Sequence, residues 1–362
     1  MFYVILKIGH SNDKRLEELT LKTWQKIVFV VVLVLFVAAS VTISLISISR
    51  APYKYEEQTA IGGDETRNGW VFTGFNGNAS TKVLRIDYVR DRDGNDPDET
   101  KPVRGIGHYV VNADEYVEEL VIGASVEWID ETAFFNAKKL QRVTVDPANT
   151  QYQDIDGVLY SKDGKTLLLY PICYGQTPAD GKDDFTYPDA YTVPAGVERI
   201  TSFAFLKNGH LRDLSLPDTL REIGDMTFFG CTALGAYAYD ADSDTLLGTG
   251  FTLPDGLETI GSDAFSKCGN IAPVLYIPAS VQTIRHHAFF ACSGMKEILL
   301  GAPDEDALSL GEQWRPKNIK HGALWSAPEP QFGMTRQDSE QLIAAYQAER
   351  LAAFREEAQN NG

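Results

Sequence analysis

The 362 residues suffice for one large domain or two ordinary ones, and a composition of 44% hydrophobic and 23% charged residues is typical of a folded chain. The formal net charge is −17, from 50 acidic and 33 basic residues. Proteins bind phosphates and anionic lipid headgroups through Lys and Arg, and an acidic surface repels them. No nucleic-acid partner is therefore expected.

The first strong feature in chain order is an uncharged apolar run of 22 residues, 27–48. At about 1.5 Å per residue, a helix of this length crosses the roughly 30 Å hydrocarbon core of a bilayer. Residues 1–26 hold five basic and three acidic side chains, and only two basic residues follow the run closely. The positive-inside rule therefore predicts a single-pass plasma-membrane protein with a cytoplasmic segment 1–26, a transmembrane helix 27–48 and an extracellular remainder. A cleaved signal peptide is the alternative, although its apolar region is normally about 7–15 residues long.

After a polar, glycine-containing linker (49–69), five segments share the pattern [VL]-x-x-I-x-x-x-[AT]-F-x-x-[small]-x-x-[apolar]-x-x-[apolar]-x-[apolar]. A degenerate unit precedes them at 104–123. The two shortest steps between the shared Phe residues are 23 and 24 residues, within the period of leucine-rich repeats. One unit cannot bury its own apolar side, so stacked units predict a β-rich solenoid over 70–302 with a continuous core. The shared Phe side chains should form one column: Phe134, Phe205, Phe228, Phe265 and Phe289.

The apolar alternation that ends each unit has the period of two that is typical of a short strand with one buried face. The [VL]-x-x-I segment and the Ala-Phe turn would then cross the core and return the chain to the next strand. Side chains at the intervening strand positions should point away from the core and form a ligand-binding surface. These candidate positions are Thr144, Ser215, Ala238, Tyr276 and Leu299. An Asp-rich loop from Asp240 to about Thr252 lengthens one unit.

The recurring V-x-x-I-x-x-x-A-F-x-x-C-x-x-L-x-x-[IL]-x-[IL]-P motif resembles the BspA-type leucine-rich repeat of bacterial surface proteins, over about Trp70 to Ala302. The segment 156–171 is similar to a hairpin often inserted in that family, and its own residues form two apolar-rich runs around an Asp-Gly turn. The opening residues 70–77 also resemble the start of the family's domain. The resemblance implies a solenoid displayed at a cell surface, often for adhesion, with a protein or glycan as ligand.

The chain continues with a Gly- and Pro-punctuated segment (303–334) that should close the solenoid. A helix is predicted over 335–359, with a capping-box-like start at Thr335 and an apolar stripe. We expect a short C-terminal helix that caps the last repeat, since exposed solenoid ends need covering. A partner-binding helix is the alternative.

Few residues point to chemistry. Cys231, Cys268 and Cys292 share one repeat position and are expected to be small core residues, with a metal or redox site as the alternative. The acidic loops that begin at Asp91 and Asp240 match only the start of an EF-hand calcium loop. The sequence contains no Gly-x-Ser-x-Gly, Walker A or His-Glu-x-x-His motif. The predicted function is therefore a non-enzymatic binding module without cofactor or metal, with an envelope scaffold as the main alternative and a glycan-acting enzyme as a minor one.

Overall fold

The computed structural model describes residues 53–361, except 66, 77–80, 92–93, 112–115, 179–184, 249, 316, 321–322 and 327–328. The predicted cytoplasmic segment and transmembrane helix lie outside the described residues. Within the described part, no helix is both long and apolar enough to span a membrane.

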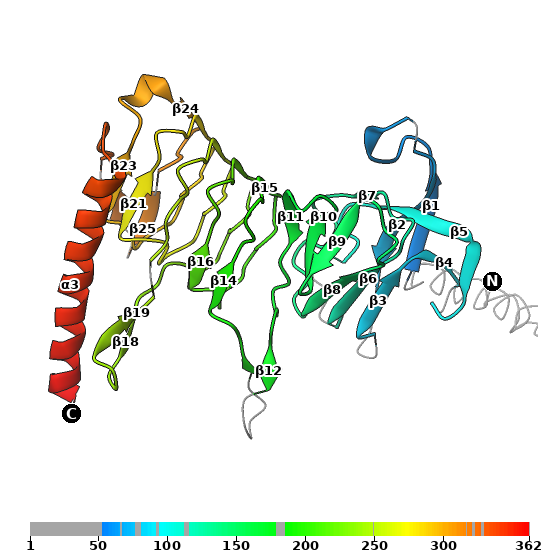
Figure 1. Cartoon of the computed structure of the whole chain (residues 1–362), viewed down its shortest axis with the longest axis horizontal. Helices are drawn as coiled ribbons and strands as arrows, with labels where there is room; N and C mark the ends of the chain where they lie inside the picture. The colour runs from blue at the N-terminus through cyan, green and yellow to red at the C-terminus, as the bar shows by residue number, and fades with distance from the viewer. Residues whose placement is uncertain are drawn as a thin grey trace, which may run out of the picture. The chain divides into compact units, whose positions relative to one another are not determined.

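The [VL]-x-x-I segments form one series of stacked parallel strands (Figure 1). The first sheet of this series pairs β2 (Gly69–Phe75), β5 (Pro97–Ile106) and β7 (Trp128–Ile129), with β1 (Tyr53–Gln58) and β4 (Tyr88–Arg90) antiparallel at its sides. The second sheet holds eight strands. In chain order they are β9 (Tyr152–Ile155), β10 (Val158–Ser161), β11 (Thr166–Leu169), β15 (Arg199–Ile200), β17 (Glu222–Ile223), β20 (Thr259–Ile260), β22 (Thr283–Ile284) and β24 (Ser309–Leu310). Strand β10 is antiparallel to both β9 and β11, and the strands from β11 to β24 are parallel.

The apolar alternation that ends each unit forms a second series of parallel strands. Its members are β3 (Val83–Ile86), β6 (Glu119–Ile122) and β8 (Arg142–Val145), then β14 (Ala190–Thr192) with β16 (Asp213–Ser215), and β21 (Val274–Ile277) with β23 (Glu297–Leu300). The prediction of strands here is confirmed, because alternate residues are buried, as in β8. The expectation that the [VL]-x-x-I segment only crosses the core is wrong, since it supplies strands of its own.

The Ala-Phe turns link successive units along a third edge. The backbone N–H of Phe205 donates to the carbonyl of Thr227 at 3.0 Å, and that of Phe228 donates to the carbonyl of Ala264 at 2.7 Å. Each turn passes through left-handed residues, such as Met226 at φ 53°. The backbone groups of the turn are therefore satisfied by the neighbouring unit rather than by water.

The buried apolar side chains form two clusters, a first core between Phe72 and Leu159 and a second core between Val158 and Trp314. Strand β10 contributes to both, because Leu159 faces the first core whereas Val158 and Tyr160 face the second. The predicted continuous core is thus divided at the hairpin β10–β11. The predicted inserted hairpin is part of the stacked sheet, because its strand β11 pairs in parallel with β15.

A column of stacked rings runs through the second core. Its neighbours lie 4.7–5.2 Å apart between ring centroids, in the order Tyr170, Phe205, Phe228, Phe265 and Phe289. Phe134 belongs to the first core, so four of the five predicted Phe residues form the column and Tyr170 begins it. The first ring of the column is therefore Tyr170, directly after the hairpin β10–β11, and not Phe134 as the sequence pattern predicted.

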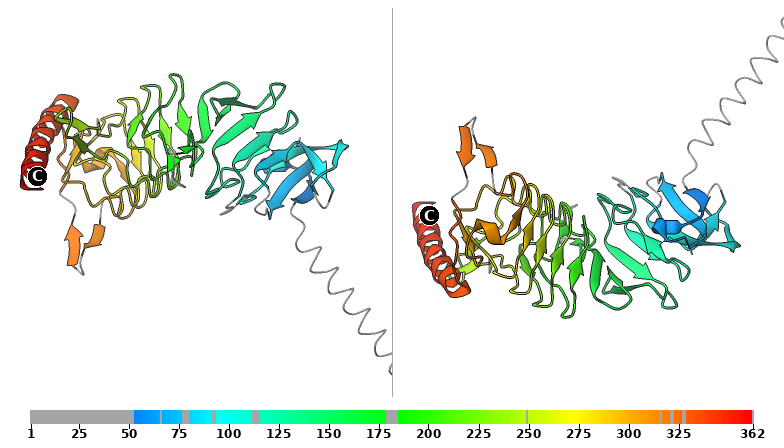
Figure 2. Two further views of the ribbon diagram at one scale, coloured as in Figure 1. Left: turned by 90° about the horizontal axis from the view of Figure 1, so that it is seen from below. Right: turned by 90° about the horizontal axis from the view of Figure 1, so that it is seen from above.

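Three antiparallel hairpins and two short helical turns complete the connections. These are β12 (Thr177–Pro178) with β13 (Phe185–Thr186), β18 (Ala238–Asp240) with β19 (Thr245–Leu247), β25 (Lys317–Lys320) with β26 (Ala323–Ser326), η1 (Ile61–Gly63) and η2 (Glu305–Ala307). Figure 2 shows β25–β26 standing off from the neighbouring strands. The predicted Asp-rich loop is the hairpin β18–β19, so Ala238 does not continue the stacked strands as expected.

Helix α3 (Arg336–Asn361) confirms the predicted C-terminal helix, and its bounds agree with the predicted range 335–359 to within two residues. Its start is a capping box in which the N–H and hydroxyl of Thr335 donate to the Asp338 carboxylate at 2.8 and 2.6 Å. The helix lies beside β21 and β19 (Figure 1). It therefore covers the outward side of the last strands.

Candidate functional site

Thr144 lies on the outward side of β8 and is exposed, as predicted. Its hydroxyl donates to the Glu119 carboxylate of the neighbouring strand β6 at 2.8 Å. Arg142, on the same strand, donates to that carboxylate at 2.7 Å. Partial burial alone would raise the pKa of Glu119, but these hydrogen bonds hold it below its usual value. The outward face of this sheet is thus a fixed array of polar groups.

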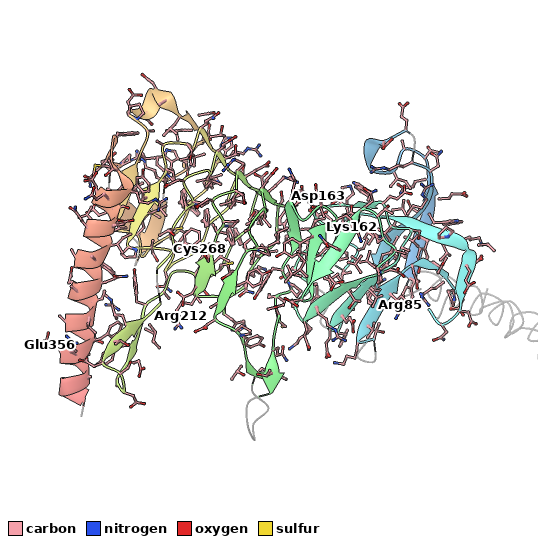
Figure 3. All side chains as sticks on the ribbon, in the orientation of Figure 1. Arg85, Lys162, Asp163, Arg212, Cys268 and Glu356 are labelled. Carbon is pink, nitrogen blue, oxygen red and sulfur yellow. The ribbon has the colours of Figure 1, made fainter. Side chains whose placement is uncertain are left out.

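A groove of about 330 Å³ crosses the same face. Its polar lining includes Thr144, Ser125, Asp146 and Arg85, which is labelled in Figure 3. The groove is shallow and open, so it suits a ligand that lies across the strands rather than one that is enclosed.

Ser215 lies on the outward side of β16 and is also exposed. It lines a second open groove, of about 460 Å³, together with Ala190 and Thr192 of β14 and Thr252 of a later loop. Arg212, labelled in Figure 3, forms an ion pair with Asp189 beside this face. Two of the five predicted positions therefore line open grooves.

Tyr276 is only partly accessible because α3 covers β21. The guanidinium of Arg336 lies 5.2 Å from the centroid of the tyrosine ring, and its Nη2 also pairs with Asp255 at 2.5 Å. Burial raises the pKa of the Tyr276 hydroxyl. The contact is structural, so Tyr276 is not a free ligand-binding position in this conformation.

Leu299 is fully buried, with 0% of its surface exposed, which contradicts its predicted place on an exposed face. The segment around Gln331 lies against β23: the N–H of Leu300 donates to the carbonyl of Gln331 at 2.8 Å, and the N–H of Gln331 donates to the carbonyl of Ile298 at 2.9 Å. A later stretch of chain therefore pairs with the edge of β23 as a further parallel strand. Ala238 is not on the stacked face either, because it belongs to the antiparallel hairpin β18–β19.

The cysteine column is buried within the second core. The thiols of Cys231, Cys268 and Cys292 each donate to the carbonyl of a Phe in the column, at 3.0–3.1 Å. Burial raises the pKa of Cys231 to about 12 and that of Cys268 well above its usual value. Neutral, hydrogen-bonded thiols of this kind fill space in the core. Cys268 is labelled in Figure 3.

The acidic loops use their carboxylates locally. Asp91 accepts hydrogen bonds from the N–H groups of Asn95 and Asp96 in its own turn. In the other loop, Asp240 accepts from Ser243 at 2.6 Å and Asp244 pairs with Arg355 of α3 at 2.7 Å. Among the described residues, no group of three or more His, Cys, Asp or Glu side chains could hold a metal ion.

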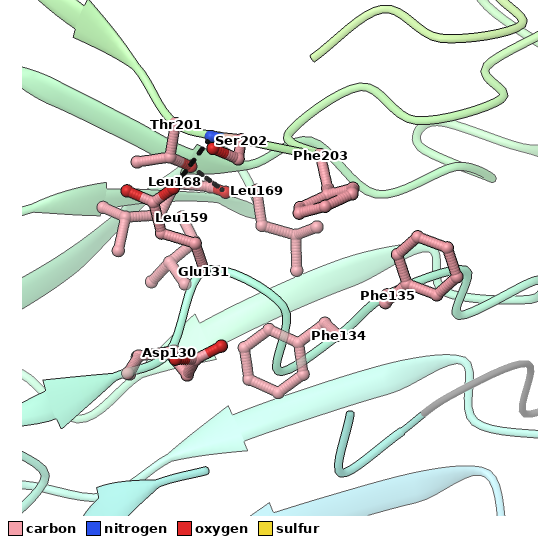
Figure 4. A pocket seen from close by; sticks show the side chains of 11 residues that line it. Asp130, Glu131, Phe134, Phe135, Leu159, Leu168, Leu169, Thr201, Ser202 and Phe203 are labelled. Carbon is pink, nitrogen blue, oxygen red and sulfur yellow. Dashed lines mark hydrogen bonds between the residues drawn. The ribbon is translucent and has the colours of Figure 1, made fainter. Parts of the chain in front are cut away.

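The small pocket in Figure 4 lies where the two cores meet. Its volume of about 20 Å³ accommodates about one water molecule and no organic substrate. Glu131 at its edge accepts hydrogen bonds from Arg199 at 2.6 Å and from the N–H of Ser202 at 3.3 Å. These contacts tie β7 to β15, so the pocket is a structural junction.

A third open groove, of about 520 Å³, was not predicted. Its lining includes Glu56 and Gln58 of β1, Thr73 of β2, Trp128 of β7, and His108 and Asp130, which follow β5 and β7. No repeat position or local motif joins these residues, so the groove could not be predicted from the sequence pattern.

Comparison with known proteins identifies the repeats. Residues 244–303 match the family model for a BspA type leucine rich repeat region, six copies. None of the curated proteins matches the chain significantly.

Several solved structures match parts of this chain. A leucine rich cell surface protein from Faecalibacterium prausnitzii is 20% identical with a TM-score of 0.39, and the alignment covers 67% of this chain and 54% of that one. The pneumococcal vaccine antigen PcpA is 16% identical with a TM-score of 0.39, over 80% of this chain and 88% of that one. A leucine-rich repeat protein from Eubacterium ventriosum is 18% identical with a TM-score of 0.37, over 67% and 64%. This chain thus spans about half the length of the Faecalibacterium protein.

Proposed function

We propose that this chain, which carries BspA-type leucine-rich repeats, is a non-enzymatic, membrane-anchored protein that binds a protein ligand at the bacterial cell surface. The apolar run 27–48 with its basic flank supports the anchor and the orientation. The remaining chain, from residue 50 onward, carries 28 basic and 47 acidic residues, which disfavours anionic partners.

The observation that carries the proposal is the open outward face of β8 and β16. Thr144 and Ser215 are exposed there and line grooves of about 330 and 460 Å³. Neither side chain belongs to a core. Stacked strands thus present polar side chains that are free to vary with the ligand while the fold stays constant.

The test compares two substitutions on this face with one elsewhere. Thr144→Arg and Ser215→Arg should each weaken saturable binding to immobilised host matrix proteins or bacterial envelope fractions, because a long cation fills the groove. Thr232→Arg is the matched control, since Thr232 is exposed but lines neither groove. All three variants should keep the melting temperature of the unaltered chain. Binding that survives both groove substitutions would refute this face as the binding surface.

One observation favours an envelope scaffold as a second candidate. Helix α3 docks through one side and leaves Leu342 on another side 38% exposed for contact with a partner. Loss of a co-purifying envelope partner after Leu342→Ser, with ligand binding unchanged, would support the scaffold function. Retention of every partner would count against it.

A further inference from the structure

We propose that the third groove binds a neutral glycan chain. The site deepens the proposed function, because it gives the binding protein a second ligand class on residues separate from Thr144 and Ser215. Its lining combines one indole ring with hydroxyl, amide, imidazole and carboxylate groups: Glu56, Gln58, Thr73, His108, Trp128 and Asp130. The volume of about 520 Å³ lies within the range of ligand sites, about 300–1,000 Å³.

The indole of Trp128 is held in place by the backbone of η1. A Cβ added at Gly62 would lie 2.5 Å from the indole Nε1, so only glycine permits this contact. The ring of His108 meets Trp128 edge-to-face, with centroids 6.5 Å apart. A fixed aromatic surface beside hydrogen-bonding groups suits a sugar ring, which has an apolar C–H side and polar edges. Preorganisation of this kind lowers the entropic cost of binding.

The polar groups of the groove are also oriented. Asp130 accepts hydrogen bonds from the N–H of Thr132 at 2.8 Å and lies 2.9 Å from Nδ1 of His108. The His108 side chain is 70% exposed, so its other ring nitrogen, Nε2, is open to a ligand hydroxyl. On the opposite wall, the amide of Gln58 donates to the Glu56 carboxylate at 3.3 Å. Sugar hydroxyls can both donate to these carboxylates and accept from the amide.

The aromatic surface continues past the groove. Tyr109, the residue after His108, is 51% exposed and packs edge-to-face on Phe135, with centroids 5.6 Å apart. Phe135 packs in the same way on Phe203, at 5.2 Å. A row of partly exposed rings suits an extended chain of sugars better than a single monosaccharide.

The charge of the lining disfavours anionic ligands, and the strand pairing restricts where a peptide can bind. The described lining residues include no Lys or Arg, so phosphates, sulfates and uronates find no partner there. An extended peptide would dock by adding a strand to a free sheet edge. Both β2 and β5 are already paired on two sides, so the middle of the groove offers no such edge; β1, at the end of the sheet, keeps one, and the Lys-rich peptide in the experiment below tests it.

The experiment uses the full chain in a detergent without a sugar headgroup. Isothermal titration with chitotetraose, maltotetraose and mannotetraose probes neutral glycans, and a polygalacturonate oligomer and a Lys-rich peptide probe the two competing chemistries. We expect saturable binding of at least one neutral tetrasaccharide and none of the polygalacturonate.

Two variants test the location. A Cβ at Gly107 would meet its nearest atom, the Phe72 carbonyl oxygen, at an ordinary 3.4 Å, so Gly107→Leu should fold and fill the groove. Gly269→Leu is the matched control, since a Cβ there meets only Ser293, at 3.6 Å. Gly107→Leu and His108→Ala should each weaken sugar binding at least about tenfold, equivalent to about 1.4 kcal/mol. Gly269→Leu should bind as the unaltered chain does.

The outcomes separate this site from the proposed protein-binding face. Sugar binding that survives Thr144→Arg and Ser215→Arg but not Gly107→Leu supports the groove, whether or not a protein ligand is found. Sugar binding unchanged by Gly107→Leu and His108→Ala overturns the assignment. The assignment is also overturned if no neutral sugar binds. It is overturned as well if only the Lys-rich peptide binds and Gly107→Leu abolishes that binding.

Discussion

Replacing Phe228 by Ala tests whether the two cores are separate. Phe228 is fully buried and stacks on Phe205 and Phe265, with ring centroids 5.0 and 5.1 Å apart. Truncation of a buried Phe costs about 3–5 kcal/mol of unfolding free energy. Each lost ring pair contributes about 0.5–1.5 kcal/mol beyond area burial, which places Phe228→Ala at the upper end of that range. Domains of ordinary stability have only about 5–15 kcal/mol in total, so the effect is large.

Phe134→Ala is the matched comparison, because Phe134 fills the same repeat position but lies in the first core, outside the ring column. Its loss should fall at the lower end of the range, about 3 kcal/mol. Repeat proteins transmit stability mainly between neighbouring units, so each variant should weaken its own core most.

Hydrogen exchange of residues 52–362, which form one compact unit, measures this by segment. Phe228→Ala should accelerate exchange in β20 and β22 while β6 and β8 stay protected, and Phe134→Ala should do the reverse. Equal acceleration of all four strands by either variant would mean that the body unfolds as one cooperative unit. The division of the core at β10 would then have no energetic meaning.

The remaining predictions concern single groups. Cys231 should resist alkylation in the folded protein up to about pH 9 and react only in denaturant, since burial raises its pKa to about 12; peptide mass spectrometry measures this. Burial alone would raise the pKa of Glu131, but hydrogen bonds from Ser202 and Arg199 lower it. The ionised Glu131 carboxylate therefore stabilises the fold fully above its unfolded pKa of about 4.3, and this stabilisation is lost as the pH falls through the lower folded pKa. Glu131→Gln should lower the free energy of unfolding at neutral pH, and in acid its free energy of unfolding should equal that of the unaltered chain. Urea titration at several pH values measures this. Thr335→Ala removes the cap of α3 and should lower its stability by about 1 kcal/mol, seen as faster exchange in its first turn.

The repeat could be predicted from the sequence because its signals are local. The [AT]-Phe turn and the small residue three positions later recur in all five matching units, and they are buried or paired as their residue types require. The [VL]-x-x-I strands were missed because they are two residues long, as in β17 and β20. A strand of that length contains no period to detect.

The errors arise where distant segments meet. The pattern at Phe134 is intact, but the hairpin β10–β11 places Tyr170 at the head of the ring column instead. Leu299 alternates as an outward residue should, yet it is fully buried where the segment around Gln331 pairs with β23 and helix α3 lies beside the neighbouring strand β21. The groove of Trp128 gathers side chains from three strands and the loops after β5 and β7, and their shared position depends on register. Register between strands is a tertiary property that one sequence does not display.

The outward residues themselves distinguish covered from open parts of the strand face. Val274 and Leu299, on β21 and β23, are apolar and buried, and helix α3 lies beside β21. Thr144 and Ser215, on earlier strands, are polar and exposed. Leaving an apolar outward side chain in water would cost about 25 cal/mol for each Å² of its surface. Apolar outward positions therefore favour packing of another segment over them, whereas polar positions do not. A ligand that approaches from this side therefore meets the strands up to β16, and the last strands serve to hold α3.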